Sequence, residues 1–186
     1  MAGLFDLKGH LVFYRLYHFN HTNVAIHLAC IPVILLLAIT LLQRYEVVGP
    51  AHPYVTLGGL VAWSYGIYYV LLDWKCGIPL MAVLVTFYNF IRQYYIGQDA
   101  AGQSHTIQVA AIAHVVLWLA QFYGHGVHEK RAPALLDNLL QALVLAPFFV
   151  AFEIAFALGL RKDLKKQMDN EAGKRIAEFK LRKKAQ

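Results

Sequence analysis

Apolar residues gather in long runs along this chain, and five of these runs approach the length that crosses a membrane. A helix needs about 20 predominantly apolar residues to span the hydrocarbon core of a bilayer. The first run is the clearest, because no charged side chain interrupts it from Ile31 to Leu42. The five predicted spans are 24–43, 54–72, 78–96, 107–123 and 139–160. The pattern therefore predicts an all-α, polytopic membrane helix bundle with four to six spans.

A different pattern precedes the first span and predicts an amphipathic N-terminal helix. Its apolar, aromatic and histidine side chains recur at steps of three or four residues, which places them on one face of a helix lying along a membrane surface. They are Leu4, Leu7, Leu11, Tyr14 and His18. The polar residues 20–23 then predict a turn, in which Thr22 or Asn23 caps the first spanning helix.

Composition and charge support the membrane interpretation and define a basic tail. The chain of 186 residues is 59% hydrophobic and 15% charged, whereas a soluble domain is roughly 45–50% apolar and about 25% charged. The formal net charge of +6 resides in residues 161–186, which hold ten basic and four acidic side chains. Because basic residues beside a membrane helix are normally cytoplasmic, 161–186 is predicted to be a basic cytosolic tail and 1–160 a single membrane-embedded domain. Since the rest of the chain is neutral, the charge does not indicate a nucleic-acid partner.

Histidines provide the candidate chemistry, and they gather in two polar segments. One segment precedes the first span and contains His18, with His27 a short way into that span; the other contains His125 and Glu129 at the exit of the fourth span. Ionisable side chains near a bilayer are costly and are by default candidates for function, and histidine is the commonest metal ligand. If the first four spans all cross, an even number of crossings separates the two segments, so both emerge on the same side.

The spacing within the second segment favours a metal site. His125 and Glu129 are four residues apart and share one face if the helix continues, although the neighbouring Gly124 and Gly126 could break it. Two or three imidazoles with one carboxylate and open coordination positions form the ligand set of non-haem Fe(II) oxygenases. The candidate ligands are thus His18, His27, His125 and Glu129. Three further histidines remain open as ligands, namely His21, His114 and His128, while interfacial hydrogen bonds are expected for His10, His52 and His105.

Other functions stay open at this point. The chain contains no HxxHH box of the membrane desaturases and no HExxH, GxSxG, GxGxxG or P-loop motif. A haem-binding bundle with His27 and His114 as axial ligands is one alternative. The other is a non-enzymatic membrane lipid-binding or transport protein, which polar residues at membrane depth such as Asp73 and Asn89 would serve.

Two multi-residue segments also resemble the family of the yeast 2-hydroxy fatty acid dioxygenase, over about residues 4–160. The first comprises 13–18 (FYRLYH), 23–27 (NVAIH) and Pro32. The second comprises 118–127 (WLAQFYGHGV) and 129–131 (EKR), followed by 133–135, 137–139 and 145–147. The resemblance is specific because both segments match in the same order.

The resemblance implies an enzyme rather than a carrier. It implies a non-haem, Fe(II)-dependent dioxygenase that performs α-oxidation of 2-hydroxy fatty acids to the one-carbon-shorter acid, as part of phytosphingosine breakdown. The residues of 1–160 would then form the catalytic domain, with His18, His27, His125 and Glu129 at its iron. By their charge, Lys130 and Arg131 are candidates to contact the carboxylate of the substrate; the alternative is that both face lipid headgroups. The implied partners are the 2-hydroxy fatty acid, O2 and membrane lipid.

Topology and location complete the expectations. Five full crossings would put both histidine segments on the side opposite the basic tail, so a re-entrant hairpin at Pro147, in the middle of the fifth run, is the favoured interpretation. The resemblance implies the endoplasmic reticulum membrane for a eukaryotic protein and the cell inner membrane otherwise. The end of the chain, Lys183-Lys184-Ala185-Gln186, fits the dilysine pattern of retrieval to the endoplasmic reticulum.

Overall fold

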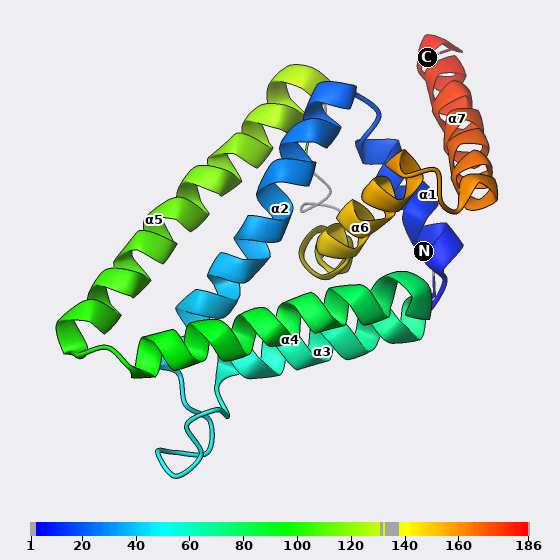
Figure 1. Ribbon diagram of the computed structural model, residues 1–186. Helices are drawn as coiled ribbons and strands as arrows, with labels where there is room; N and C mark the ends of the chain where they lie inside the picture. The colour runs from blue at the N-terminus through cyan, green and yellow to red at the C-terminus, as the bar shows by residue number, and fades with distance from the viewer. Residues whose placement is uncertain (1–2, 131, 133–137, 186) are drawn as a thin grey trace. The chain divides into compact units, whose positions relative to one another are not determined.

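The computed structural model describes residues 3–130, 132 and 138–185, and the regular structure within these ranges is helical (Figure 1). A single β-bridge, between Glu46 and Thr56, lies in the connection that precedes α3 (Leu57–Leu72). The predicted all-α class is therefore confirmed. The chain forms two compact units, one of residues 1–28 with 122–186 and one of residues 29–121. The predicted division at residue 160 stays a prediction.

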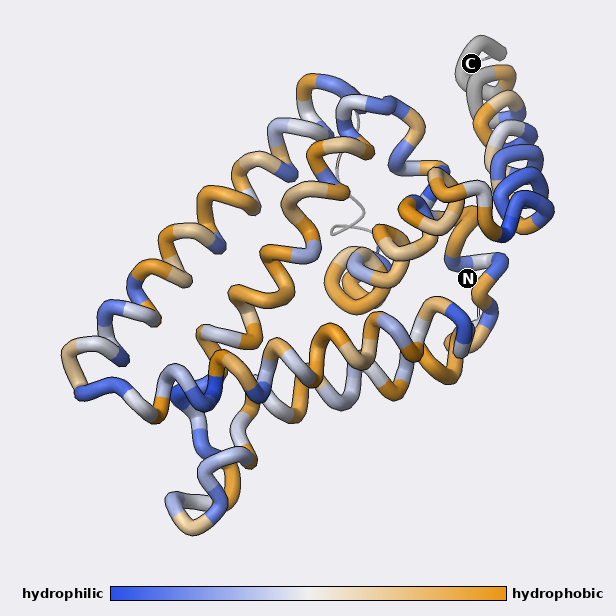
Figure 2. The backbone as a smooth tube through the Cα atoms, in the orientation of Figure 1, coloured by the Kyte–Doolittle hydropathy of each residue, from blue (hydrophilic) through white to orange (hydrophobic). Residues whose placement is uncertain are grey.

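Within the described ranges, four helical segments are long and apolar enough to cross a membrane, as the sequence predicts. They are His21–Arg44 (α2, His21–Leu41, with η1, Leu42–Arg44), Trp74–Ile96 (α4), Ala100–Glu129 (α5, Ala100–Tyr123, with η2, Gly124–Glu129) and Leu140–Ala157 (η4, Leu140–Leu145, with α6, Ala146–Ala157). The second predicted span, 54–72, corresponds to the shorter apolar helix α3. Figure 2 shows hydrophobic residues along most of α2 and α5. Large apolar side chains face outward on these segments, among them Phe90 and Ile112, as lipid-facing residues do.

In the unit of residues 29–121, α3 and α4 lie side by side and are joined at a single residue (Figure 1). Asp73 ends α3 and caps α4, because its carboxylate accepts a hydrogen bond from the backbone N–H of Cys76 at 3.0 Å. Glycine allows the two backbones to approach, since a Cβ at Gly66 would meet the side chain of Met81 at 2.6 Å. The third predicted span, 78–96, is thus part of a close helical pair.

Arg92 explains the charge within that span. The residue is 1% exposed, and its guanidinium donates to the carbonyl oxygens of Pro53 and Gln43 at 2.5 and 3.0 Å. It also forms an ion pair with Glu46 at 2.5 Å. A buried cation needs such partners to offset its lost hydration. Arg92 therefore fastens the connection between α2 and α3 onto α4.

The unit of residues 1–28 and 122–186 is built around α1 (Leu7–Tyr17). The predicted amphipathic helix forms, and its buried face, which includes Leu11 and Val12, packs inside this unit. The helix α7 (Lys162–Ala185) packs against α1 and buries Met168 and Ala172 completely. The first half of the basic tail is thus part of the packed unit rather than a solvated appendage.

Two local expectations were wrong. Neither Thr22 nor Asn23 caps α2. Their backbone N–H groups instead donate to the side-chain oxygen of Asn20, at 2.9 and 3.3 Å, so the capping residue lies two positions before Thr22. Nor does the chain turn back at Pro147, because η4 and α6 run on as one helical segment. Pro147 lies in the first turn of α6, where its missing N–H costs little. The π-helical segment η4 directly before α6 accommodates the hydrogen bond that the proline cannot donate.

Candidate metal centre

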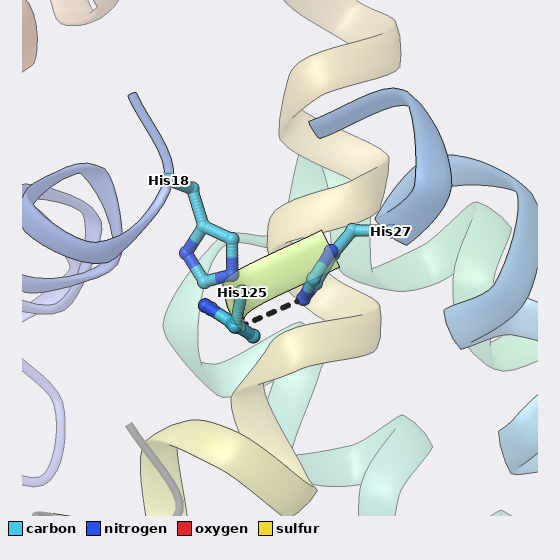
Figure 3. A group of neighbouring side chains, drawn as sticks. All are labelled: His18, His27 and His125. Carbon is cyan, nitrogen blue, oxygen red and sulfur yellow. Dashed lines mark hydrogen bonds between the residues drawn. The ribbon is translucent and has the colours of Figure 1, made fainter. Parts of the chain in front are cut away.

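Three buried histidines converge in the first unit from three separate segments. His18 follows the end of α1, His27 lies in the second turn of α2 and His125 lies in η2; each side chain is at most 7% exposed. Their ring centroids are 4.5, 4.8 and 5.0 Å apart in pairs. One nitrogen of each ring lies within 4.8 Å of the others, and Figure 3 shows the rings pointing toward one another. Among the described residues, this is the cluster that could hold a metal ion.

Two hydrogen bonds fix the orientation of two of these rings. Nδ1 of His18 donates to the carbonyl oxygen of Tyr14 at 3.0 Å, and Nδ1 of His27 donates to that of Asn23 at 2.9 Å. Because a carbonyl oxygen can only accept, the proton of each neutral ring resides on Nδ1 and the lone pair on Nε2. Nε2 of His18 is buried and has no hydrogen-bond partner among the described residues. A buried acceptor of this kind is suited to a metal ion.

The separation of the other two nitrogens also fits a metal. Nε2 of His27 and Nε2 of His125 are 3.1 Å apart (Figure 3). With metal–nitrogen bonds of about 2.1 Å, two imidazole ligands at right angles would have their nitrogens about 3.0 Å apart. The three rings can therefore serve as neighbouring ligands of one ion and leave further coordination positions open.

Burial keeps His18 neutral. Removal from water lowers the pKa of His18 well below its ordinary value, and the nearby His27 lowers it further, while the hydrogen bond to Tyr14 acts in the opposite direction. The ring is consequently neutral at neutral pH, with its proton on Nδ1, so that a metal ion does not have to displace a proton from Nε2.

Tyr14 belongs to the site, although it was not among the site residues predicted from the sequence. Its ring stacks on His18 at 4.3 Å and on Phe149 of α6 at 4.7 Å. Burial raises its pKa above the ordinary value, helped by the nearby Glu153, so the phenol stays protonated. The four-residue interval between Tyr14 and His18 was the available signal, because it places the two side chains on one helical face.

Arg15, next to Tyr14 in the chain, connects several elements of the same unit. Arg15 forms ion pairs with Glu153 of α6 at 3.4 Å and with Asp169 of α7 at 2.9 Å, and also donates to the carbonyl oxygen of His18 at 3.3 Å. The cation therefore joins α1, α6 and α7 next to the first candidate ligand.

The segment of His125 does not continue as an α-helix. Gly124–Glu129 is a π-helical segment, which the backbone N–H of Lys130 closes on the carbonyl oxygen of His125. Such segments carry an extra residue per turn and are frequent at functional sites. A Cβ at Gly124 would meet Oδ1 of Asn23 at 2.5 Å, so glycine allows this close approach of η2 to α2. The glycines that were expected to break the helix thus accompany a wider turn instead.

Glu129 is engaged differently from the other candidate ligands. Its Oε1 accepts from the backbone N–H of Phe19 at 2.9 Å; its Oε2 accepts from the backbone N–H of Asn20 at 3.0 Å and from the side-chain amide of Asn23 at 3.2 Å. The ligand role that the sequence suggested for Glu129 stays a prediction. In the structure, its carboxylate connects η2 to residues 19–23 through these three hydrogen bonds.

The remaining sequence candidates lie apart from the three-histidine cluster or outside the described residues. Lys130 follows η2 with an exposed side chain and a left-handed backbone (φ 54°), and Arg131 lies outside the described residues. His21 is exposed, and the ring of His128 contacts Tyr123. His114, in the other unit, accepts a hydrogen bond from the indole of Trp118 at 2.9 Å.

His10 differs from the interfacial expectation. It is buried and makes hydrogen bonds at both ring nitrogens, one with the carbonyl oxygen of Leu4 at 3.2 Å and one with Gln141 at 2.6 Å. Both nitrogens are therefore already used within the unit.

Comparison with known proteins identifies the family of this chain. A family model described as 2-hydroxy-palmitic acid dioxygenase Mpo1-like matches residues 4–158. The 2-hydroxy-palmitic acid dioxygenase MPO1 of Saccharomyces cerevisiae is 35% identical over 173 residues, which cover 91% of each chain. No solved structure matches the chain. Since the family model spans most of the sequence and includes all three clustered histidines, the chain belongs to the Mpo1-like family of 2-hydroxy-palmitic acid dioxygenases.

Proposed function

We propose that this protein is a 2-hydroxy fatty acid dioxygenase whose iron is held by His18, His27 and His125. The observation that carries the proposal is the cluster of three buried imidazoles, each offering one nitrogen within 4.8 Å of the others. The relative's name, 2-hydroxy-palmitic acid dioxygenase, supports the substrate class and the reaction class. Three neutral nitrogen ligands with open positions suit Fe(II) that must also bind substrate and O2.

The reaction balances without a second organic substrate. A 2-hydroxy fatty acid and O2 together contain the atoms of the one-carbon-shorter acid, CO2 and water. The C1–C2 bond breaks, carbon 2 is oxidised to the new carboxyl group, and O2 is reduced. Fe(II) held by the imidazoles supplies the redox activity and a positive charge for the carboxylate and 2-hydroxyl oxygens of the substrate.

The residues of the chain prepare the site for this chemistry. The carbonyl oxygens of Tyr14 and Asn23 hold two imidazoles with their lone pairs turned toward the cluster. Tyr14 covers one face of His18 with its ring, which helps to exclude water. A dry, fixed set of ligands limits side reactions and reorganisation during the reaction.

The substrate, the topology and the location extend the proposal. We assign the apolar helices to the acyl chain and Lys130 to the substrate carboxylate, because this exposed cation directly follows the segment of His125. The same role for Arg131 rests on the sequence alone. The basic residues of 161–186 support a cytosolic tail, and Lys183-Lys184 supports the endoplasmic reticulum membrane if the host is a eukaryote. There the activity would serve phytosphingosine breakdown.

The test combines metal content with turnover on detergent-purified protein. We expect about one iron per chain after anaerobic loading, and oxygen uptake matched by formation of the C15 acid when 2-hydroxypalmitate is added. His125→Ala should abolish both, whereas His128→Ala, in the same segment, should leave both intact. Stoichiometric zinc without oxygen uptake would contradict the redox chemistry. No bound metal at all would contradict the enzyme and favour a lipid carrier.

A further inference from the structure

The carboxylate of Glu129 contacts the polypeptide on both sides of the metal centre. Its hydrogen bonds reach the backbone of Phe19 and Asn20, directly after His18, and the side chain of Asn23, in the first turn of α2. Glu129 itself belongs to η2, four residues after His125. A single side chain thus joins the three segments that carry the three histidines.

The hydrogen bonds continue from these contacts to the ligands themselves. Asn23, whose amide donates to Glu129, accepts the Nδ1 proton of His27 on its backbone carbonyl oxygen. Phe19 is the residue bonded to His18, so the position of its N–H fixes the chain at that ligand. The carboxylate also lies at the N-terminus of α2, where the helix dipole favours a negative charge.

Both oxygens of Glu129 are engaged in this arrangement. Turning the carboxylate toward a metal ion would break up to three hydrogen bonds. Two of them, from the backbone N–H of Asn20 and the side-chain amide of Asn23, are partly buried, and leaving such donors without a partner is costly. Glu129 is not among the residues whose ligand atoms cluster with those of His18, His27 and His125.

We propose that Glu129 is a positioning residue of the metal centre: its carboxylate ties the connection after His18 and the start of α2 to η2, and so sets the separation of the three imidazoles. This inference rests on the proposed metal centre but not on the identity of the oxidised substrate. It differs from a ligand role, in which Glu129 would contact the metal directly.

The test uses Co(II), whose visible spectrum reports its ligands, bound to the purified full-length protein in detergent. Glu129→Gln retains the size of the side chain but has only one acceptor oxygen, so at least one of the three hydrogen bonds is lost. We expect Co(II) affinity to fall about 10- to 100-fold, as for other residues that orient metal ligands. The ligand-field bands of the saturated variant should match those of the wild type. Glu178→Gln, the same change at an exposed position of α7, should leave the affinity unchanged.

A double-mutant cycle identifies the path of the effect. Asn23→Ala removes one donor to Glu129 and retains the backbone carbonyl that holds His27. We expect this variant to weaken Co(II) binding less than Glu129→Gln does, and the two changes together to cost less than the product of their separate effects. Asn23→Ala also provides a second measurement if Glu129→Gln fails to fold, because it leaves the hydrogen bonds to Phe19 and Asn20 in place.

The outcomes that would contradict the positioning role differ from the outcome that would contradict the proposed function. Shifted Co(II) bands in the saturated Glu129→Gln protein would identify Glu129 as a ligand and overturn the inference. Unchanged affinity in Glu129→Gln, or strictly multiplicative effects in the cycle, would also overturn it, as would the absence of a Co(II) site in the wild type. If the iron-loaded wild-type protein does not turn over 2-hydroxypalmitate while the Co(II) results are as expected, the proposed dioxygenase reaction is contradicted and the positioning role of Glu129 is retained.

Discussion

At the scale of single residues, small features decide whether the three imidazoles meet. Tyr14 illustrates this, because its backbone oxygen orients His18, its ring covers the same imidazole, and its hydroxyl forms a hydrogen bond with Glu153. The backbone carbonyl oxygen is retained in any substitution of Tyr14, whereas the ring and the hydroxyl can be removed separately. The contributions of the ring and of the hydroxyl can therefore be measured with different variants.

Substitution of Tyr14 separates these two contributions. Tyr14→Phe keeps the ring on His18 but leaves a buried carboxylate without one donor, so we expect a loss of about 1–3 kcal/mol in stability with metal binding retained. Tyr14→Ala also removes the stacked ring and should cost about 3–5 kcal/mol and weaken metal binding. Thermal unfolding and Co(II) titration measure the two effects. Equal metal affinity in Tyr14→Ala and the wild type would contradict a role of the ring in holding His18.

Two glycines of η2 provide a matched pair. Gly124→Ala would put a methyl group 2.5 Å from Oδ1 of Asn23, so η2 and α2 must move apart at the metal centre. We expect a loss of about 1–3 kcal/mol in stability together with weaker metal binding. Gly126→Ala meets nothing within 4 Å and should leave both quantities unchanged. A similar response of the two variants in the same assays would argue against close packing at Gly124.

At the scale of elements, α7 is divided between a packed half and an outer half. Met168 and Ala172 are completely buried, and Asp169 pairs with Arg15 of α1, whereas Leu181 is 67% exposed. The residues that the sequence presented as one basic tail therefore serve two purposes. The inner turns complete the core of the unit that contains the three-histidine cluster.

Truncation of side chains along α7 tests this division. Met168→Ala removes a fully buried side chain and should destabilise the protein by about 2–5 kcal/mol. Leu181→Ala in the outer half should change the stability by no more than about 0.5 kcal/mol. Chemical denaturation monitored by circular dichroism measures both. If the two variants unfolded alike, the packing of α7 against α1 would be refuted.

At the scale of the whole molecule, the two compact units should respond differently to metal. All three histidines belong to the unit of residues 1–28 and 122–186. Metal at 100 times its dissociation constant stabilises a folded protein by about 2.7 kcal/mol. We therefore expect chelation to speed hydrogen exchange in α1, η2 and α6 and to leave α3 and α4 unaffected. Uniform loss of protection would contradict this assignment, and His125→Ala should show no response to the chelator.

The sequence by itself determined the fold class and the composition of the site. Long apolar runs can satisfy their backbone polar groups in a membrane only as helices or closed barrels, and their length favours helices, so the polytopic helical architecture could be predicted from local pattern alone. The candidate ligands His18, His27 and His125 stood out because histidines are rare and costly at such depths. The family resemblance linked them to iron and a 2-hydroxy acid, and the comparisons confirm the family.

Only the tertiary structure decided how these residues are used. The cap at Asn20, the continuous helix through Pro147 and the π-helical turn at Gly124 each depend on contacts or backbone geometry that hydrophobic periodicity does not encode. Glu129 received its partners from a segment 110 residues away along the chain, which no local spacing could indicate. Periodicity is a property of neighbours in sequence, whereas the three-histidine cluster depends on which distant N–H groups and side chains meet when the unit packs.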